Sequence, residues 1–216
     1  MKRFRLPLII GLAIAGAGWL GFWLWKNDFE RRCGIDSANS ELSGAIHRLQ
    51  IASGSRIRPL HVRSDKPARE ANLMHVRMTA ALLSDLSRLT TLTTVNLNGT
   101  NVGDADLSYL QPLVNLEVLY LSDTRITDAG LDRLAGLKKL KTLDLGDTAL
   151  SDVGLAKLQA LPELEELYLA NAGITDAGLE HLQRLPRLKM VFLNGAQVTA
   201  KGIEALGKAC PGLQIY

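Results

Sequence analysis

The sequence has few of the residues that build disulfide, metal and cofactor sites. Its two cysteines, Cys33 and Cys210, lie near opposite ends of the chain and form no CxxC pair. They predict neither a disulfide framework nor a cysteine metal site. The four histidines show no HExxH spacing, and the chain has no phosphate-binding GxxxxGK(S/T) loop, GxGxxG fingerprint, GxSxG elbow or EF-hand loop. We therefore predict a protein without enzymatic activity, metal or cofactor.

The charge is divided unevenly along the chain. Residues 1–90 contain 14 Lys and Arg against 7 Asp and Glu, whereas residues 91–216 contain 11 against 15. A basic stretch beside a membrane can bind anionic lipid or nucleic acid. Such stretches are more often only solvated, and we expect no nucleic-acid partner for this chain.

A run of twenty residues without a charge, 6–25, follows a short basic tail at 1–5. As a helix it would rise about 30 Å, which matches the hydrocarbon core of a bilayer. Trp19, Trp23 and Trp25 gather toward its C-terminal end, as in the aromatic belt of a membrane interface. Its small residues also allow a cleaved signal peptide. Cleavage would leave WLGFWLW exposed, so we favour an uncleaved membrane anchor.

The flanks of this run say little about its orientation, because three Lys or Arg residues lie close to it on each side. A short basic tail before a signal anchor usually stays in the cytoplasm. We therefore expect a single-pass membrane protein with the remainder of the chain outside the cytoplasm. Residues 26–72 are interpreted as a connector with partial structure. Its short helix would have one apolar side, formed by Leu42, Ala45, Ile46 and Leu49.

Beyond residue 90 the sequence repeats every 24 residues. One series with this spacing is Val95, Leu119, Leu143, Leu167 and Val191. A second series is Leu92, Leu116, Leu140, Leu164 and Leu188. Both fit the framework LxxLxLxx(T/A)x(I/V)xxxGLxxLxxL, in which an alternating strand pattern precedes leucines that fall three apart. One unit is too short to fold alone, so the units must stack and share a core.

This framework resembles the leucine-rich repeat, whose period is about 20–29 residues. The TDAGL sequence at 127–131 and 175–179 is similar to that of bacterial membrane-anchored leucine-rich-repeat proteins and of the substrate-reading repeats of F-box proteins. The CPGL near the end resembles the turn of the cysteine-containing repeat class. The resemblance implies an α/β solenoid with a curved parallel sheet and short helices, used for protein binding. We place it at residues 73–216, as a short capping repeat plus about five repeats.

In the predicted capping repeat, Val76 and Met78 occupy the strand positions of the repeat leucines. Within TDAGL, the Thr is predicted to cap a short helix and the Asp to favour its positive dipole end. The Gly would let the helix start close to the preceding turn. A catalytic acid would not be copied every 24 residues, so TDAGL is interpreted as a helix start. Calcium binding by Asp123 and Asp147, which stack between neighbouring repeats, is a minor alternative.

The strand residues on either side of the buried leucines are predicted to point to the concave face of the solenoid. We predict that a protein partner binds there, at Arg77, Asn96, Tyr120, Asp144, Tyr168, Phe192, Glu166 and Met190. Exposed aromatic residues are enriched at binding hot spots. The alternative is that these aromatic rings only pack on one another. Six strands give a face of about 400 Å², half of the ~800 Å² that one partner contributes to a stable complex.

The small face predicts weak or transient binding, unless the loops, the connector or a weak homo-oligomer add to it. Our leading hypothesis is a non-catalytic, membrane-anchored module that binds another protein or peptide. A structural envelope protein that associates with itself is a second hypothesis. A third is the substrate-recognition adaptor of a ubiquitin-ligase-like complex, although no F-box segment precedes the repeats.

Overall fold

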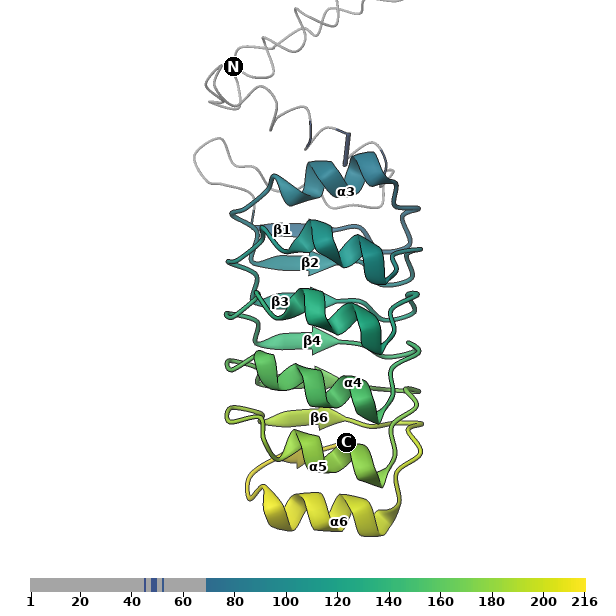
Figure 1. Cartoon of the computed structure of the whole chain (residues 1–216), viewed down its shortest axis with the longest axis vertical. Coiled ribbons are helices and arrows are strands. Elements are labelled where there is room, and N and C mark those ends of the chain that lie inside the picture. The colour runs from purple at the N-terminus through teal and green to yellow at the C-terminus, as the bar shows by residue number, and fades with distance from the viewer. Residues whose placement is uncertain (1–44, 46–47, 50–51, 53–68) are drawn as a thin grey trace, which may run out of the picture.

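The computed structural model describes residues 45, 48–49, 52 and 69–216. Residues 69–216 form a stack of similar turns, each with a strand on one side and a short helix on the other (Figure 1). In these parts of the chain no helix combines the length and the apolarity that crossing a bilayer requires. The predicted anchor at 6–25 lies outside the described residues.

The strands form one parallel sheet in chain order, and each strand pairs with the next. Their bounds are β1 Glu70–Asn72, β2 Thr94–Asn96, β3 Val118–Tyr120, β4 Thr142–Asp144, β5 Glu166–Tyr168, β6 Met190–Phe192 and β7 Gln214–Ile215. The register follows the sequence period, because each residue pairs with the one 24 positions later, as Leu119 does with Leu143. The predicted α/β architecture of stacked 24-residue repeats is confirmed for this part of the chain.

The opposite side of the stack carries short helices of both α and 3₁₀ type. Their bounds are α3 Ala80–Ser87, η3 Asp104–Leu110, η4 Asp128–Leu134, α4 Asp152–Lys157, η5 Leu158–Ala160, α5 Asp176–Leu182 and α6 Ala200–Ala209. The leucine spacing is compatible with the 3₁₀ form, in which residues three apart eclipse one another, but the α-helix α5 buries Leu179 and Leu182 at the same spacing. In η4, Leu131 and Leu134 are both buried in this way.

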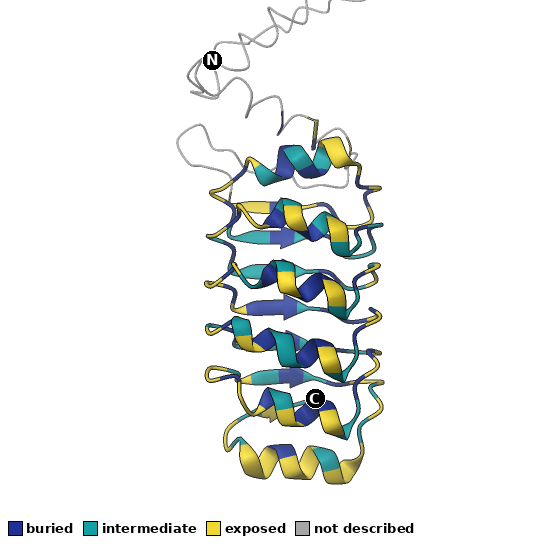
Figure 2. Ribbon diagram, viewed as in Figure 1, coloured by how far each residue is buried: buried dark blue, intermediate teal, exposed yellow. Residues whose placement is uncertain are grey.

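The core is a continuous column of leucines between the sheet and the helices (Figure 2). The central residue of each strand from β2 to β6 is buried, and the residues beside it are half-buried in nearly every case. Leu119, Leu143 and Leu167 are fully buried. Burying a leucine side chain contributes about 1.5–3 kcal/mol relative to leaving it exposed. Stacking therefore supplies the stabilisation that one repeat lacks.

The first strand does not lie where the sequence analysis placed it. β1 ends at Asn72, and Ala71 pairs with Val95 in the same 24-residue register as the later strands. The first repeat is therefore full length, and the predicted start at residue 73 falls just after its strand. Val76 and Met78 are buried in the loop that follows. Met78 occupies the position that Val102 holds one repeat later.

The N-terminal end of the core is covered by part of the predicted connector helix. The four described residues before residue 69 are helical, and Ala45 and Leu49 among them are fully buried. Arg48 donates two hydrogen bonds of 2.6 Å to Asp85, a buried carboxylate on α3. The prediction that Ala45 and Leu49 share one buried helix side is confirmed, whereas Leu42 and Ile46 lie outside the described residues.

A residue with positive φ lies in the turn three positions after each of the strands β1–β6. These residues are His75, Gly99, Asp123, Asp147, Asn171 and Gly195, with φ between 53° and 78°. Gly, Asn and Asp tolerate this left-handed conformation better than other residues. Asp123 and Asp147, considered above as calcium ligands, therefore have a structural reason to be where they are.

The TDAGL motif joins one repeat to the next. The carboxylate of Asp152 accepts hydrogen bonds from the backbone N–H of Thr175 at 2.9 Å and from its hydroxyl at 2.6 Å. The same pair of bonds links Asp104 to Thr127, Asp128 to Ser151 and Asp176 to Thr199. Each Asp thus holds the helix cap of the following repeat, a role that the dipole interpretation did not include. We call this contact the Asp staple.

The Gly of TDAGL provides the space for the Asp staple. A Cβ on Gly178 would lie 2.2 Å from Oδ1 of Asp152, and Gly130, Gly154 and Gly202 have the same conflict with the Asp before them. At the N-terminal end of the array the Asp and the Gly are both absent from these positions. The first repeat has Ala80 at the position of this Asp, so it provides no such carboxylate to the second repeat. The second repeat has Asp106 at the position of the Gly, and the Asp106 carboxylate accepts a hydrogen bond from the N–H of Gly103. The predicted helix caps by Thr127, Ser151 and Thr175 are confirmed.

Candidate binding face

The first and third residues of each strand point away from the leucine core, because successive side chains of a strand alternate between its two faces. We define the concave face as these residues in β1–β6, together with Gln214 and Tyr216 at the last strand. In most strands they are half-buried, which leaves them accessible beside a fully buried central residue. The face is therefore separate from the core.

Seven of the eight predicted binding residues lie on this face. The sheet register places Asn96, Tyr120, Asp144, Tyr168 and Phe192 in one column of neighbouring strands. Glu166 and Met190 are neighbours in the parallel column beside it. Whether a partner binds these residues remains a prediction.

Arg77 does not belong to the face. It is exposed in the loop between β1 and α3, because the first strand lies five residues earlier than predicted. Its place in the column is taken by Asn72, which pairs with Asn96. The sequence analysis also missed Tyr216 at the other end of the column. The 24-residue spacing from Asn96 and Phe192 would have identified both residues.

Three aromatic rings form a stack at the C-terminal end of the face. The ring centroids of Tyr168 and Phe192 are 4.4 Å apart with an interplanar angle of 4°. Those of Phe192 and Tyr216 are 4.7 Å apart with an angle of 12°. The rings cover one another's faces, so they present their edges to solvent. The interpretation that the rings pack on one another thus holds for Tyr168 and Phe192. Together with Tyr216 they form a rigid aromatic ridge on the face, which we call the aromatic ladder.

Asp144 lies between Tyr120 and Tyr168 in the central column. Its carboxylate accepts hydrogen bonds from the N–H of Gly146 at 3.0 Å and from the Asn98 side chain at 3.3 Å. Burial raises the pKa of this carboxyl above its ordinary value, since desolvation disfavours the charged form, and the negative charge of Asp147 acts in the same direction. The two hydrogen bonds oppose that shift.

The polar residues of the column share one local role. Asn72 and Asn96 each accept a hydrogen bond from the N–H two residues later, at 3.3 and 3.0 Å, as Asp144 does. This bond closes the turn at the end of the strand. An amide oxygen supports the turn as well as a carboxylate does, so the negative charge of Asp144 is not needed for it.

Glu166 extends the polar surface next to the aromatic ladder. Its carboxylate accepts weak hydrogen bonds from the hydroxyls of Thr142 at 3.4 Å and Tyr168 at 3.5 Å. Burial raises the pKa of Tyr168, and the nearby carboxylate of Glu166 raises it further. Asp144, Glu166 and Tyr168 thus form a connected acidic and aromatic region on neighbouring strands.

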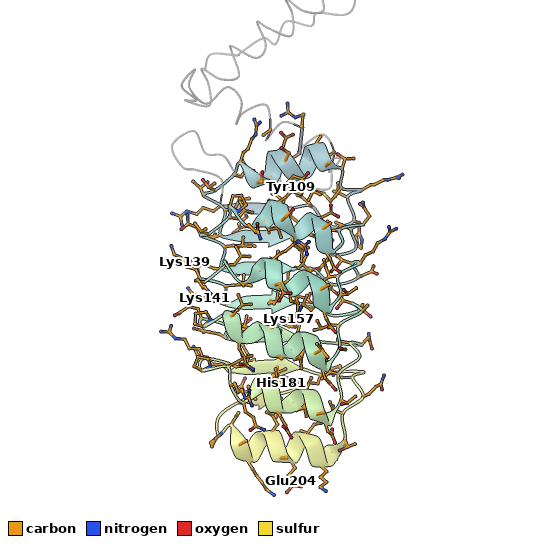
Figure 3. All side chains as sticks on the ribbon, in the orientation of Figure 1. Tyr109, Lys139, Lys141, Lys157, His181 and Glu204 are labelled. Carbon is orange, nitrogen blue, oxygen red and sulfur yellow. The ribbon has the colours of Figure 1, made fainter. Side chains whose placement is uncertain are left out.

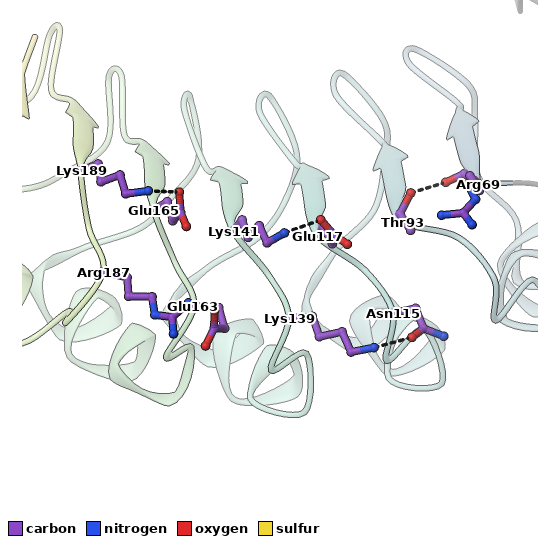
Figure 4. A network of polar contacts seen from close by, with 10 residues as sticks. All are labelled: Arg69, Thr93, Asn115, Glu117, Lys139, Lys141, Glu163, Glu165, Arg187 and Lys189. Atoms are coloured by element: carbon purple, nitrogen blue, oxygen red, sulfur yellow. Dashed lines mark hydrogen bonds and ion pairs between the residues drawn. The ribbon is translucent and has the colours of Figure 1, made fainter.

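One lateral edge of the sheet is charged but internally paired (Figure 4). Lys141 bonds to Glu117 at 2.7 Å and Lys189 to Glu165 at 2.6 Å, each pair joining successive repeats. Lys139 reaches Asn115, and Arg187 pairs with Glu163. Hydrogen bonds from the paired lysines lower the pKa of Glu117 and of Glu165. The edge has five bases, among them Arg69 and Lys139, against the three acids Glu117, Glu163 and Glu165, so it carries a small net positive charge.

The convex side of residues 69–216 is formed by the short helices. In Figure 3, which looks onto the helices, Tyr109, Lys157 and His181 lie on three different turns of the stack, on η3, α4 and α5. Lys157 is paired with Asp132 of the preceding repeat at 2.7 Å. Among residues 69–216 and the few described before them, no three metal-ligating side chains gather into a group. The concave face is therefore our candidate site.

Comparisons with known proteins agree with this architecture. Residues 114–157 match the family described as Leucine Rich repeats (2 copies), and residues 88–110 match a Leucine Rich repeat family. No curated protein sequence matches the chain. An internalin from Listeria monocytogenes is similar in structure over 71% of this chain, with 24% identity and a TM-score of 0.53. A Leptospira interrogans LRR protein is similar over 74%, with 22% identity and a TM-score of 0.55.

At these identities the two structures support the fold alone. The matched regions amount to 42% and 40% of those two chains, so this chain spans about two fifths of each.

Proposed function

We propose that this leucine-rich-repeat protein is a non-catalytic, membrane-anchored module that binds another protein through its concave face. The observation that carries the proposal is the aromatic ladder of Tyr168, Phe192 and Tyr216 on that face. Aromatic rings that are held rigid lose little conformational entropy on binding and provide a large contact area. Repeat solenoids use their extended sheet faces for protein recognition.

The membrane part of the proposal rests on the uncharged run at 6–25 and the tryptophans at its end. The short basic tail before it favours an orientation with the repeats outside the cytoplasm. An anchor would keep the module at one surface, which raises the effective concentration of a membrane-bound partner. Weak contacts then suffice for function.

The size of the face fits such a weak interaction. Seven strands at about 4.8 Å spacing give a length of roughly 29 Å, slightly more than the six strands predicted from the sequence. With a width of about 17 Å the area is roughly 500 Å², still below the ~800 Å² typical of one partner in a stable complex.

The binding proposal is tested by Tyr120→Ala combined with Tyr168→Ala in the full-length chain. Partners are identified by crosslinking in native membranes, and the variant should lose most of the crosslinked protein. The matched control is Val114→Ala with Val153→Ala, which removes two exposed apolar side chains outside the concave face. Both variants are first checked by circular dichroism for an intact fold. An unchanged crosslinked set in the folded tyrosine variant would rule out the concave face.

The orientation is tested by placing a cysteine at Val153, whose side chain is 65% exposed. A membrane-impermeant maleimide should label Val153→Cys in intact cells as strongly as after lysis. The wild-type chain, with Cys33 and the partly buried Cys210, gives the background. Labelling that occurs only after lysis would place the repeats in the cytoplasm.

A further inference from the structure

The corrected register of the first strand leaves the concave face without a base. Its charged residues are Glu70, Asp144 and Glu166, and none of its other positions in β1–β7 is Lys, Arg or His. The basic excess of the chain lies before the repeats, since residues 91–216 contain 11 Lys and Arg against 15 Asp and Glu. Two exposed acids, Asp123 and Asp147, adjoin the face in the turns that follow β3 and β4. The face thus carries acids and no base, within a part of the chain that is itself slightly acidic.

Asp144 is a half-buried carboxylate at the centre of this face. Its carboxylate accepts hydrogen bonds from the amide of Asn98 and the N–H of Gly146, and the charge that acts on it is that of Asp147, which is negative. A carboxylate that is partly desolvated without a counter-ion costs folding stability. Asn at this position would keep the turn, as Asn72 and Asn96 do, and would avoid that cost.

The surroundings of Asp144 suit a long cationic side chain. Tyr120 and Tyr168 pair with it on the two neighbouring strands, about 4.8 Å away on either side. Lys and Arg pack their aliphatic stems along apolar and aromatic surface while the charged end reaches a carboxylate. Glu166 lies next to Tyr168 and offers a second carboxylate within the same region. The edges of the aromatic ladder can receive an apolar residue of the same partner.

We propose that the concave face binds an extended protein segment that carries Lys or Arg, with one cationic side chain on Asp144 and a second on Glu166. This inference rests on the proposed function and names the class of its partner. The lateral edge carries a small net positive charge despite its ion pairs, so any attraction for a cationic segment comes from the face itself. Nucleic acid and anionic lipid carry the wrong charge for this surface.

The test uses the full-length chain in zwitterionic detergent and two fluorescein-labelled decapeptides. One alternates Lys with Val, and the other alternates Glu with Val. Fluorescence anisotropy should show weak binding of the Lys peptide, no binding of the Glu peptide, and a loss of affinity as salt rises. The double variant Asp144→Asn with Glu166→Gln should weaken binding of the Lys peptide at least about tenfold, because both partly desolvated charge pairs are lost.

The matched control removes two acids outside the face, by Glu180→Gln with Glu204→Gln, and should leave the affinity within about twofold. Equal losses in the two double variants would show that only the overall charge matters and would overturn the proposal. Binding of the Glu peptide would do the same.

The proposed function has its own readout in the crosslinking experiment. If the tyrosine variant loses its crosslinked partner while Asp144→Asn with Glu166→Gln keeps it, the concave face binds a protein of another class. In that case this inference fails and the proposed function stands.

Discussion

The Asp staple predicts that the destabilisation caused by Gly178→Ala depends on whether Asp152 is present. A Cβ at residue 178 would lie 2.2 Å from Oδ1 and 2.9 Å from Cγ of Asp152, well inside van der Waals contact. The carboxylate must therefore move by more than about 1 Å and lose its two bonds to Thr175. Hydrogen bonds to charged groups contribute about 1.5–3 kcal/mol, and overpacking adds about 1–3 kcal/mol. We expect Gly178→Ala to lower the free energy of unfolding by about 2–3 kcal/mol.

The same substitution should hardly change the free energy of unfolding when Asp152 has been replaced. Asp152→Ala alone should cost about 2 kcal/mol through the lost bonds. In that background the nearest known neighbour of the new methyl group is Cγ2 of Ile174, at 3.2 Å, and Ala is favoured over Gly in a helix by about 0.5–1 kcal/mol. Gly178→Ala should then change stability by less than about 0.5 kcal/mol. The coupling energy of the double-mutant cycle should be about 2 kcal/mol.

The cycle is measured by urea unfolding of the full-length chain, followed by circular dichroism. Gly136→Ala provides the control, because a Cβ there has no neighbour within 4 Å, and it should add to Asp152→Ala without coupling. A coupling energy below about 0.5 kcal/mol for the 152–178 pair would refute the Asp staple as the reason for the glycine.

Three further predictions concern other positions. Asp144→Asn should stabilise the fold at neutral pH, because burial raises the pKa of Asp144 in the folded state. In thermal melts, the difference in stability from wild type should grow as pH rises through that folded-state pKa and should vanish below the pKa of the unfolded state. Hydrogen bonds from the hydroxyl of Thr199, and then from its N–H, lower the pKa of Asp176. The stabilisation by Asp176 should therefore be present above the pKa of the unfolded state and be lost as pH falls through the pKa of the folded state. Asp176→Asn should remove this pH dependence of stability. His75→Asn should raise the free energy of unfolding by about 0.5–1 kcal/mol, since residue 75 has a φ of 59°, and no gain in urea unfolding would show that the left-handed turn is not strained.

Local periodicity was sufficient to predict the repeats. The 24-residue spacing of Leu119, Leu143 and Leu167 fixes which residues enter the core, because alternation along a strand and the three-residue leucine spacing are properties of each segment by itself. The helix caps at Thr127 and Thr175 were predicted for the same reason, since a cap is a contact within two residues. The concave position of Tyr120 and Tyr168 followed directly.

The local apolar pattern did not place the first strand, although counting 24 residues back from Val95 leads to Ala71. Ala71 with Leu73 and Val76 with Met78 both show the spacing of the two strand leucines, and the second pair is the more apolar in its strand position. Pairing with Val95 selects Ala71, since hydrogen bonds to the next strand hold the register while Val76 and Met78 fill the loop. That choice removed Arg77 from the face and left the face acidic.

The sequence by itself determined the period, the core residues and the helix caps of this protein. The tertiary structure decided how the repeats contact one another. The stacking of Phe192 on Tyr168 and Tyr216, and the space that Gly178 leaves for Asp152, join residues about 24 positions apart. Such contacts exist only after the solenoid has stacked, because they depend on the rise and register between neighbouring repeats, which no single segment contains.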